Sequence, residues 1–247
     1  MRDVRKDKNF LYTQSSIVTF MQCPLKFRYR YFDGLYGSDD ETLKGSFEKG
    51  NKFHLLAERY FKEIDTDVNY IKEKELKELF EKLKEKYPIE ANCRYFSEYE
   101  IRENAEKIRL MARYDLIILK PNGRVQIVDF KTNKRKISKK SIEESLQTKI
   151  YLYLLKENYK SVFENIRKIK NIEMIYYQTE YSEENFTVKY DDELHEKNKS
   201  FLSETIENIE VFNFDEYEKK EVNHCKVCEF KNFCWKNKKS VDDTLYL

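Results

Sequence analysis

The chain has 247 residues, of which 40% are hydrophobic and 37% are charged, and it contains only five glycines and three prolines. This composition excludes a disordered chain and favours a compact protein of regular elements with charged outer faces. The net charge of +2 does not by itself indicate a nucleic-acid binder. The charged N-terminus lacks a signal sequence and no apolar run could span a membrane, so we expect a cytoplasmic protein without a membrane partner.

The first predicted elements are two helices that meet at Cys23. Ser15 and Ser16 can cap the first helix, and Pro24 suits the first turn of the second. Residues 26–32, KFRYRYF, then alternate basic with aromatic side chains. This composition suits phosphate contacts with base stacking, and it suits equally an amphipathic helix with its aromatic side chains inward.

Two longer helices are predicted at 45–64 and 72–87. The first has a stripe of aromatic residues with His54 beside it, where a histidine is usually just packed. The second is charged and amphipathic, and Pro88 ends it. Alternating residues between 94 and 111 then predict two strands that turn at Glu103-Asn104.

The most informative stretch is a predicted β-hairpin that carries charged side chains in otherwise apolar strands. Residues 114–119 and 125–130 are β-branched and apolar runs, and a Pro-Asn-Gly turn signal lies between them. Side chains two residues apart project from the same face of a strand, so Asp129 and Lys131 lie together and Asp115 can join them.

These three side chains suit a metal site. Asp115 and Asp129 supply the oxygen ligands that Mg²⁺ prefers. Lys131 would sit beside the ion, where it can orient or help deprotonate an attacking water. The ordinary interpretation of an Asp-x-Lys pair is a solvated strand edge, so this spacing alone does not establish a catalytic site.

Further elements complete the predicted fold. A basic run at 134–140 could follow a phosphate backbone at the mouth of the site, although such runs are usually just solvated. A helix at 143–157 is followed by strands at 170–178 and 186–190 and by a helix at 193–210. This alternation predicts an α/β fold with a mixed central sheet flanked by helices.

Three cysteines near the C-terminus have the spacing of metal ligands, C-x2-C-x5-C. In a reducing compartment such close cysteines are ligands rather than disulfide partners. A site of four ligands needs one more, for which Cys23, Cys93 and His224 are the candidates. Four thiolates suit both zinc and an iron–sulfur cluster.

Taken in chain order, these motifs resemble the PD-(D/E)XK nuclease superfamily, and in particular its RecB-like branch. The matching features are the Cys-Pro helix in 12–35, the Gly-x-x-x-His helix in 50–60, Asp115, Asp129-Phe130-Lys131, the Gln-x-x-x-Tyr helix at 147–151 and the C-terminal cysteines. Ala112 stands where the family usually has glycine, and Tyr114 where it has proline. These two departures concern the local backbone geometry and do not remove a metal ligand.

The resemblance implies a metal-dependent DNA nuclease, an exonuclease on single-stranded DNA or DNA ends in recombination, repair or phage DNA processing. The residues to which it gives catalytic roles are Lys131, Asp115, Asp129, Gln147 and Tyr151. It places Mg²⁺ or Mn²⁺ on His54, Asp115 and Asp129. The family often has an acidic residue on its first strand near the site, and Glu98 is the best match, although an exposed strand glutamate is its ordinary interpretation.

The resemblance also favours a [4Fe-4S] cluster, with zinc as the alternative, held by Cys23, Cys225, Cys228 and Cys234. Such a cluster would staple segment 12–35 to segment 215–240 and couple metal binding to folding. The chain would then be one nuclease domain, 1–247, with its core at about 45–190.

Two other functions remain open at this point. One is a CRISPR-adaptation nuclease that trims prespacers. The other is a non-catalytic DNA-binding module of the same fold, against which the intact Asp115, Asp129 and Lys131 argue. The sequence contains no Walker-type glycine loop or helicase motif, so a helicase, like any recombination or CRISPR protein, would be a separate partner.

Overall fold

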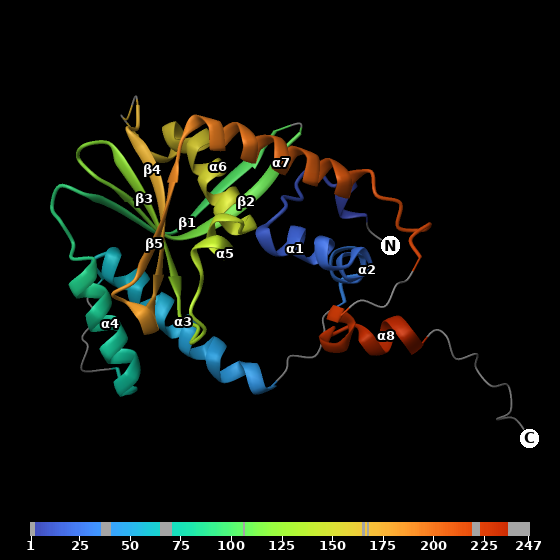
Figure 1. The fold of residues 1–247 in the computed structure, drawn as a ribbon, viewed down its shortest axis with the longest axis horizontal. Coiled ribbons are helices and arrows are strands. Elements are labelled where there is room, and N and C mark those ends of the chain that lie inside the picture. The colour runs from blue at the N-terminus through green and yellow to red at the C-terminus, as the bar shows by residue number, and fades with distance from the viewer. Residues whose placement is uncertain are drawn as a thin grey trace, which may run out of the picture.

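The computed structural model describes residues 3–35, 41–64, 71–105, 107–164, 166, 168–218 and 223–236. A five-stranded mixed sheet lies at its centre, with helices on both faces (Figure 1). The α/β fold expected from the alternation of helices and strands is thereby confirmed. None of the described helices is long and apolar enough to cross a membrane.

The strands lie side by side in the order in which they occur along the chain. They are β1 (Arg94–Asn104), β2 (Arg109–Leu119), β3 (Arg124–Lys131), β4 (Asn171–Gln178) and β5 (Asn185–Tyr190). Neighbouring strands are antiparallel except β3 and β4. A parallel pair needs a long crossover, and α5 (Lys139–Glu143) and α6 (Leu146–Val162) provide it.

Both predicted hairpins are present. Gly123, in the turn between β2 and β3, has φ +77, a conformation that favours glycine. The first hairpin turns beyond Asn104 rather than at Glu103-Asn104, because the ladder continues to the pair Asn104↔Arg109. Ala105 N then donates to Ile108 O (3.0 Å) and closes the turn.

The helices cover the sheet in two layers, each with its own apolar core (Figure 1). The core that we call the α6 core lies on the side of α6, α7 (Asp192–Glu210), α1 (Gln14–Gln22) and α2 (Pro24–Phe27). The core that we call the α3 core lies under α3 (Glu41–Phe61) and α4 (Lys74–Lys86) and includes Phe53, Phe80 and Phe130. These helices confirm the predicted ones, with shifted ends.

The cap of α1 differs from the prediction. Thr13, not Ser15 or Ser16, is the N-cap residue, and its hydroxyl accepts a hydrogen bond from Ser16 N (3.1 Å). Thr13 N donates to Ser16 Oγ (2.9 Å), so Ser16 completes a capping box from inside the helix. Pro24 begins α2 as predicted, and Cys23 lies at the junction of the two helices.

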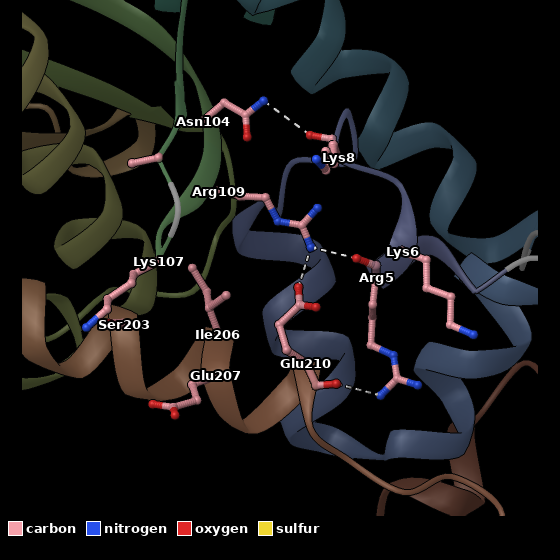
Figure 2. A pocket seen from close by; sticks show the side chains of 11 residues that line it. Arg5, Lys6, Lys8, Asn104, Lys107, Arg109, Ser203, Ile206, Glu207 and Glu210 are labelled. Atoms are coloured by element: carbon pink, nitrogen blue, oxygen red, sulfur yellow. Dashed lines mark hydrogen bonds and ion pairs between the residues drawn. The ribbon is translucent and has the colours of Figure 1, made fainter.

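Two arginines hold the N-terminal segment against the first hairpin and the end of α7 (Figure 2). Arg109 donates to the carbonyl oxygens of Asp7 (2.7 Å) and Arg5 (3.0 Å) and forms an ion pair with Glu210. Arg5 donates to three backbone carbonyls at the end of α7. Carbonyls at a helix end lack partners within the helix, so Arg5 acts as a cap supplied from the other end of the chain.

We expect Arg109→Ala to lower the free energy of unfolding by about 2 kcal/mol, because the Glu210 carboxylate and two carbonyl groups lose their donor. Urea unfolding followed by circular dichroism measures the change. The control is Arg102→Ala, whose side chain lies on β1, is 65% exposed and pairs with Glu100. Its expected change is below about 0.5 kcal/mol. Equal losses in both variants would contradict a specific role for Arg109.

Candidate active site and cysteine site

The side chains of β2 change faces at Asp115. Ala112 packs into the α6 core, whereas Leu116 and Ile118 pack into the α3 core. These positions are separated by even numbers of residues, so a regular strand would place them on one face. The strand is therefore irregular at Asp115.

The neighbouring strand changes faces at the same level. On β1, Tyr95 packs against the α3 core and Ile101 lies in the α6 core, again an even number of residues apart. Glu98, between them, has φ +48, in the left-handed region that a residue with a Cβ seldom adopts. Glu98 stands opposite Asp115, between the pairs Ser97↔Leu116 and Tyr99↔Tyr114. The two irregular residues thus both carry carboxylates.

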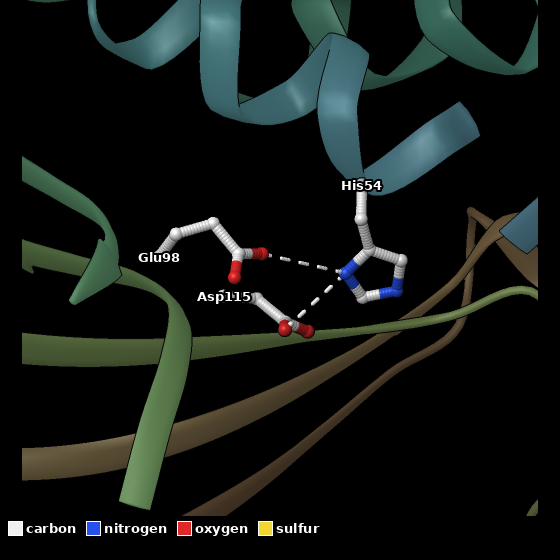
Figure 3. Close-up of side chains that lie close together, drawn as sticks. All are labelled: His54, Glu98 and Asp115. Atoms are coloured by element: carbon white, nitrogen blue, oxygen red, sulfur yellow. Dashed lines mark ion pairs between the residues drawn. The ribbon is translucent and has the colours of Figure 1, made fainter. Parts of the chain in front are cut away.

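His54 on α3 completes a cluster with these carboxylates (Figure 3). Its Nδ1 lies 3.3 Å from Asp115 Oδ1 and 3.9 Å from Glu98 Oε1. One ligand atom from each of the three residues lies within 4.8 Å of the others. The cluster opens into a pocket of about 350 Å³. Such a set of nitrogen and oxygen donors could hold a divalent cation.

Gly50, one helical turn before His54, lets α3 approach the end of β3. A Cβ at this position would lie 3.0 Å from Thr132 Oγ1. Thr132 follows Lys131, so a side chain at Gly50 would crowd the Thr132 hydroxyl between the helix that carries His54 and the strand that carries Lys131. This close approach explains the glycine of the Gly-x-x-x-His pattern in this chain.

Asp129 and Lys131 project from the same face of β3, as their spacing predicts. Lys131 Nζ lies 2.6 Å from Asp129 Oδ2 and donates to Gln147 Oε1 (3.0 Å) on α6. Gln147 Nε2 donates to Asp129 Oδ1. Asp129 is 3% exposed, and its Oδ2 has no polar contact among the described residues other than the ion pair with Lys131.

Asp115 connects the two groups. Its Oδ2 accepts a hydrogen bond from Phe130 N (2.7 Å) just beyond Leu116↔Val128, the last pair between β2 and β3. The side chain therefore satisfies a backbone group of β3 where the ladder stops, while Oδ1 faces His54. Asp115 thereby lies between the histidine of α3 and the acidic residue of β3.

Tyr151 lies one turn after Gln147, as expected, but its hydroxyl does not contact Lys131. It donates to the carbonyl oxygen of Arg113 (2.7 Å), two residues before Asp115. Tyr114 Oη donates in turn to Tyr151 O (2.9 Å). The structure brings Tyr151 to the backbone of β2 rather than to the charged groups.

The crowding of carboxylates disturbs their protonation. Burial and the nearby Asp115 raise the pKa of Asp129 to about 6, although Lys131 opposes the shift. Burial and Asp115 also raise the pKa of Glu98. Burial alone would lower the pKa of His54, but Asp115 and Glu98 raise it. A bound cation would relieve this repulsion, so the residues present fit Mg²⁺ or Mn²⁺.

The basic run at 134–140 lies next to this site. Gln178, at the end of β4, donates to the carbonyl oxygens of Asn133 (3.0 Å) and Arg135 (2.6 Å) and accepts from Ile137 N (3.2 Å). The loop is thereby fixed at the end of the sheet that carries Lys131. Lys136 pairs with Glu184 (2.7 Å).

Four cysteines from the two ends of the chain line one small cavity of about 20 Å³. They are Cys23, Cys225, Cys228 and Cys234. Cys225 lies in η5 (Asn223–Val227) and Cys234 in α8 (Lys231–Lys236), beside the junction of α1 and α2. Cys93 lies elsewhere, with Sγ 3.7 Å from a carboxylate oxygen of Glu90. His224 lines the same cavity as the four cysteines.

Other contacts join the two ends beside these cysteines. Glu229 pairs with Lys26 (3.2 Å) and with Arg30. The ring of Tyr29 meets Phe230 edge to face, with ring centres 5.7 Å apart. Of the expected C-terminal segment, residues 219–222 and 237–240 lie outside the described residues. The thiols are thus carried by segments that are also packed together through side chains.

We expect Asp129→Asn to stabilise the protein at pH 8 in the presence of a chelator, by up to about 3 kcal/mol. The raised pKa means that the folded state holds an ionised buried carboxylate above about pH 6 at a cost. That cost disappears as the pH falls through 6, so the difference between the variant and the wild type should shrink towards pH 4. Thermal melting at several pH values measures it. A variant less stable than the wild type at pH 8 would contradict this account.

Comparisons with known proteins agree with this geometry. A model of the PD-(D/E)XK nuclease superfamily matches residues 12–235. The fold is similar to the crystal structure of a protein called "putative exonuclease" from Eubacterium rectale, with a TM-score of 0.51 and 8% identity over 90% of this chain and 94% of that one. A second similar structure is SSO0001, with a TM-score of 0.40 and 15% identity over 91% of this chain and 85% of that one. A search of curated proteins finds no significant match.

The family model spans His54, Asp115, the Asp129-Phe130-Lys131 segment and all four cysteines of the cavity. The Eubacterium rectale structure shares the fold at low identity and shows no more than that. Because the model covers most of its length, the chain belongs to the PD-(D/E)XK nuclease superfamily.

Proposed function

We propose that the protein is a metal-dependent deoxyribonuclease of the RecB-like branch, an exonuclease on single-stranded DNA or DNA ends in recombination, repair or phage DNA processing. The observation that carries the proposal is the convergence of His54, Glu98 and Asp115 with the Asp129–Lys131 pair. Membership of a nuclease superfamily supports phosphodiester hydrolysis. The exonuclease assignment follows the sequence resemblance and the name of the similar Eubacterium rectale protein.

In this proposal, Mg²⁺ or Mn²⁺ is held by His54, Asp115 and Asp129, with Glu98 as a further carboxylate. The burial of Asp129 Oδ2, which among the described residues has only the ion pair with Lys131 beside it, and the 3.3 Å approach of His54 to Asp115 support this ligand set. A divalent cation supplies charge stabilisation for the scissile phosphate and lowers the pKa of a water that it coordinates.

Lys131 serves the phosphate and the attacking water. Its ammonium is fixed by Asp129 and by the carbonyl oxygen of the Gln147 side chain. A water oxygen attacks phosphorus, the bond to the leaving oxygen breaks, and that oxygen takes up a proton. The Lys131 charge offsets the negative charge that builds on the phosphate. Gln147 positions Lys131, and Tyr151 supports the strand before Asp115.

We extend the proposal to a [4Fe-4S] cluster on Cys23, Cys225, Cys228 and Cys234, which would staple the two ends of one nuclease domain with its core at about 45–190. The four thiols lining one cavity support it. Four thiolates suit both a cluster and a tetrahedral zinc ion, and the preference for the cluster follows the sequence resemblance.

End-labelled single- and double-stranded DNA, incubated with Mg²⁺ or Mn²⁺, tests the activity. The wild type should shorten the DNA from an end, and Lys131→Ala should lower the rate at least about 100-fold because the charge at the phosphate is lost. The matched control is Lys136→Ala, in the following loop, which should stay within about twofold of the wild type because Lys136 pairs with Glu184.

Two outcomes of this assay would count against the proposal. A wild-type rate in Lys131→Ala would remove this lysine from the mechanism. DNA left intact by the wild-type protein with either metal would contradict the nuclease function itself.

Anaerobically purified protein should be brown and contain about four irons per chain. Serine at Cys23, Cys225, Cys228 or Cys234 should remove the iron and make both ends of the chain sensitive to proteases, because metal binding contributes to folding. Cys93→Ser is the control and should keep its iron. One zinc per colourless chain would contradict the cluster, and full iron in Cys23→Ser would contradict the staple.

A further inference from the structure

The three histidines of the chain lie in different environments. His54 belongs to the acidic cluster. His195 has both ring nitrogens paired, Nε2 with Glu157 (2.7 Å) and Nδ1 with Tyr190 (3.0 Å). His224 differs from both, because its Nε2 is buried and has no hydrogen-bond partner among the described residues.

A buried polar atom without a partner needs an explanation. Leaving such an atom unsatisfied costs about 1 to 3 kcal/mol, and most buried polar groups in proteins are paired. The Nε2 atom of His224 therefore indicates a partner other than the described residues.

The position of His224 identifies that partner. Its side chain lines the cavity of the four cysteines, and it directly precedes Cys225 in η5. Two lysines, Lys26 and Lys231, also line the cavity. Lys26 already pairs with Glu229 (3.2 Å), and Lys231 is an exposed residue. Within the described part of the chain, Nε2 of this imidazole is the buried side-chain nitrogen of the cavity that lacks a hydrogen-bond partner.

We propose that His224 donates a hydrogen bond from Nε2 to a sulfur of the cluster held by the four cysteines, and so stabilises the reduced form of that cluster. The inference rests on the proposed [4Fe-4S] group. Four thiols already supply the ligands that such a cluster needs, so the imidazole acts as a positioning group outside the ligand set. Hydrogen bonds to cluster sulfurs are among the factors that set the reduction potential.

The direction of the effect follows from charge. One-electron reduction by an external reductant adds one negative charge to the cluster. An N–H group directed at a sulfur stabilises this charge more than it stabilises the oxidised form. Removing the donor should therefore shift the midpoint potential to more negative values.

Two variants of the full chain, purified anaerobically with iron, test the inference. His224→Phe keeps a ring but removes the donor, whereas His224→Gln keeps an N–H group of similar reach. Redox titration followed by electron paramagnetic resonance should give His224→Phe about a tenfold smaller equilibrium constant for reduction, which is about 59 mV for one electron. His224→Gln should recover at least half of this shift. His195→Gln is the control and should leave the potential unchanged.

A second measurement reads the hydrogen bond directly. Electron–nuclear double resonance of the reduced wild type should detect an exchangeable proton coupled to the cluster, lost on transfer to heavy water and missing in His224→Phe. A merely structural role for His224 would not produce this signal.

The outcomes separate this inference from the proposed function. Iron-loaded variants that share the wild-type potential would overturn the inference and leave the cluster standing. Wild-type protein without iron would overturn both the inference about His224 and the proposed cluster. Loss of iron from folded His224→Phe and His224→Gln alike would show that the imidazole is a ligand and not a donor. Loss from His224→Phe alone, with iron kept in His224→Gln, would support the donor role.

Discussion

The change of faces at Glu98 and Asp115 is the constraint on which the rest of the candidate site depends. If β2 were regular, the Asp115 side chain would project into one of the two apolar cores. Because both strands switch sides at this level, their two carboxylates lie at the boundary between the α3 core and the α6 core. The left-handed backbone of Glu98 costs about 1 to 2 kcal/mol, and the burial of both cores offsets it.

This boundary position brings groups from five separate elements together. His54 comes from the helix over the α3 core, whereas Gln147 comes from the helix over the α6 core. Asp115 contacts His54 with one oxygen and the backbone of β3 with the other, so it holds the helix over the α3 core in a fixed position relative to β3. The resulting crowd of carboxylates is unfavourable without a cation, as the raised pKa of Asp129 indicates. The free energy of unfolding is therefore lower than it would be with neutral side chains at this site, which is typical of sites that bind a cation.

The sequence predicted the sheet and much of the candidate site because their signals are local. Asp129 and Lys131 share a face by spacing alone, and Gly123 marks its turn by the conformation that glycine permits. Glu98 could not be singled out by spacing, since RYFSEYEIR reads as a regular alternating strand and its break depends on two competing cores. The bonds from Arg5 and Arg109 to distant carbonyl groups have no local pattern either. The resemblance paired Cys23 with the C-terminal cysteines, and no spacing rule spans that distance.

Diffraction from crystals grown with Mn²⁺, recorded at the manganese absorption edge, tests the central claim most directly. The face change at Glu98 and Asp115 should assemble one cation site, so we predict an anomalous peak in contact with His54 Nδ1 or Nε2 and with the carboxylates of Asp115 and Asp129. A peak bound by other residues, or a pocket without a peak at saturating Mn²⁺, would contradict the account.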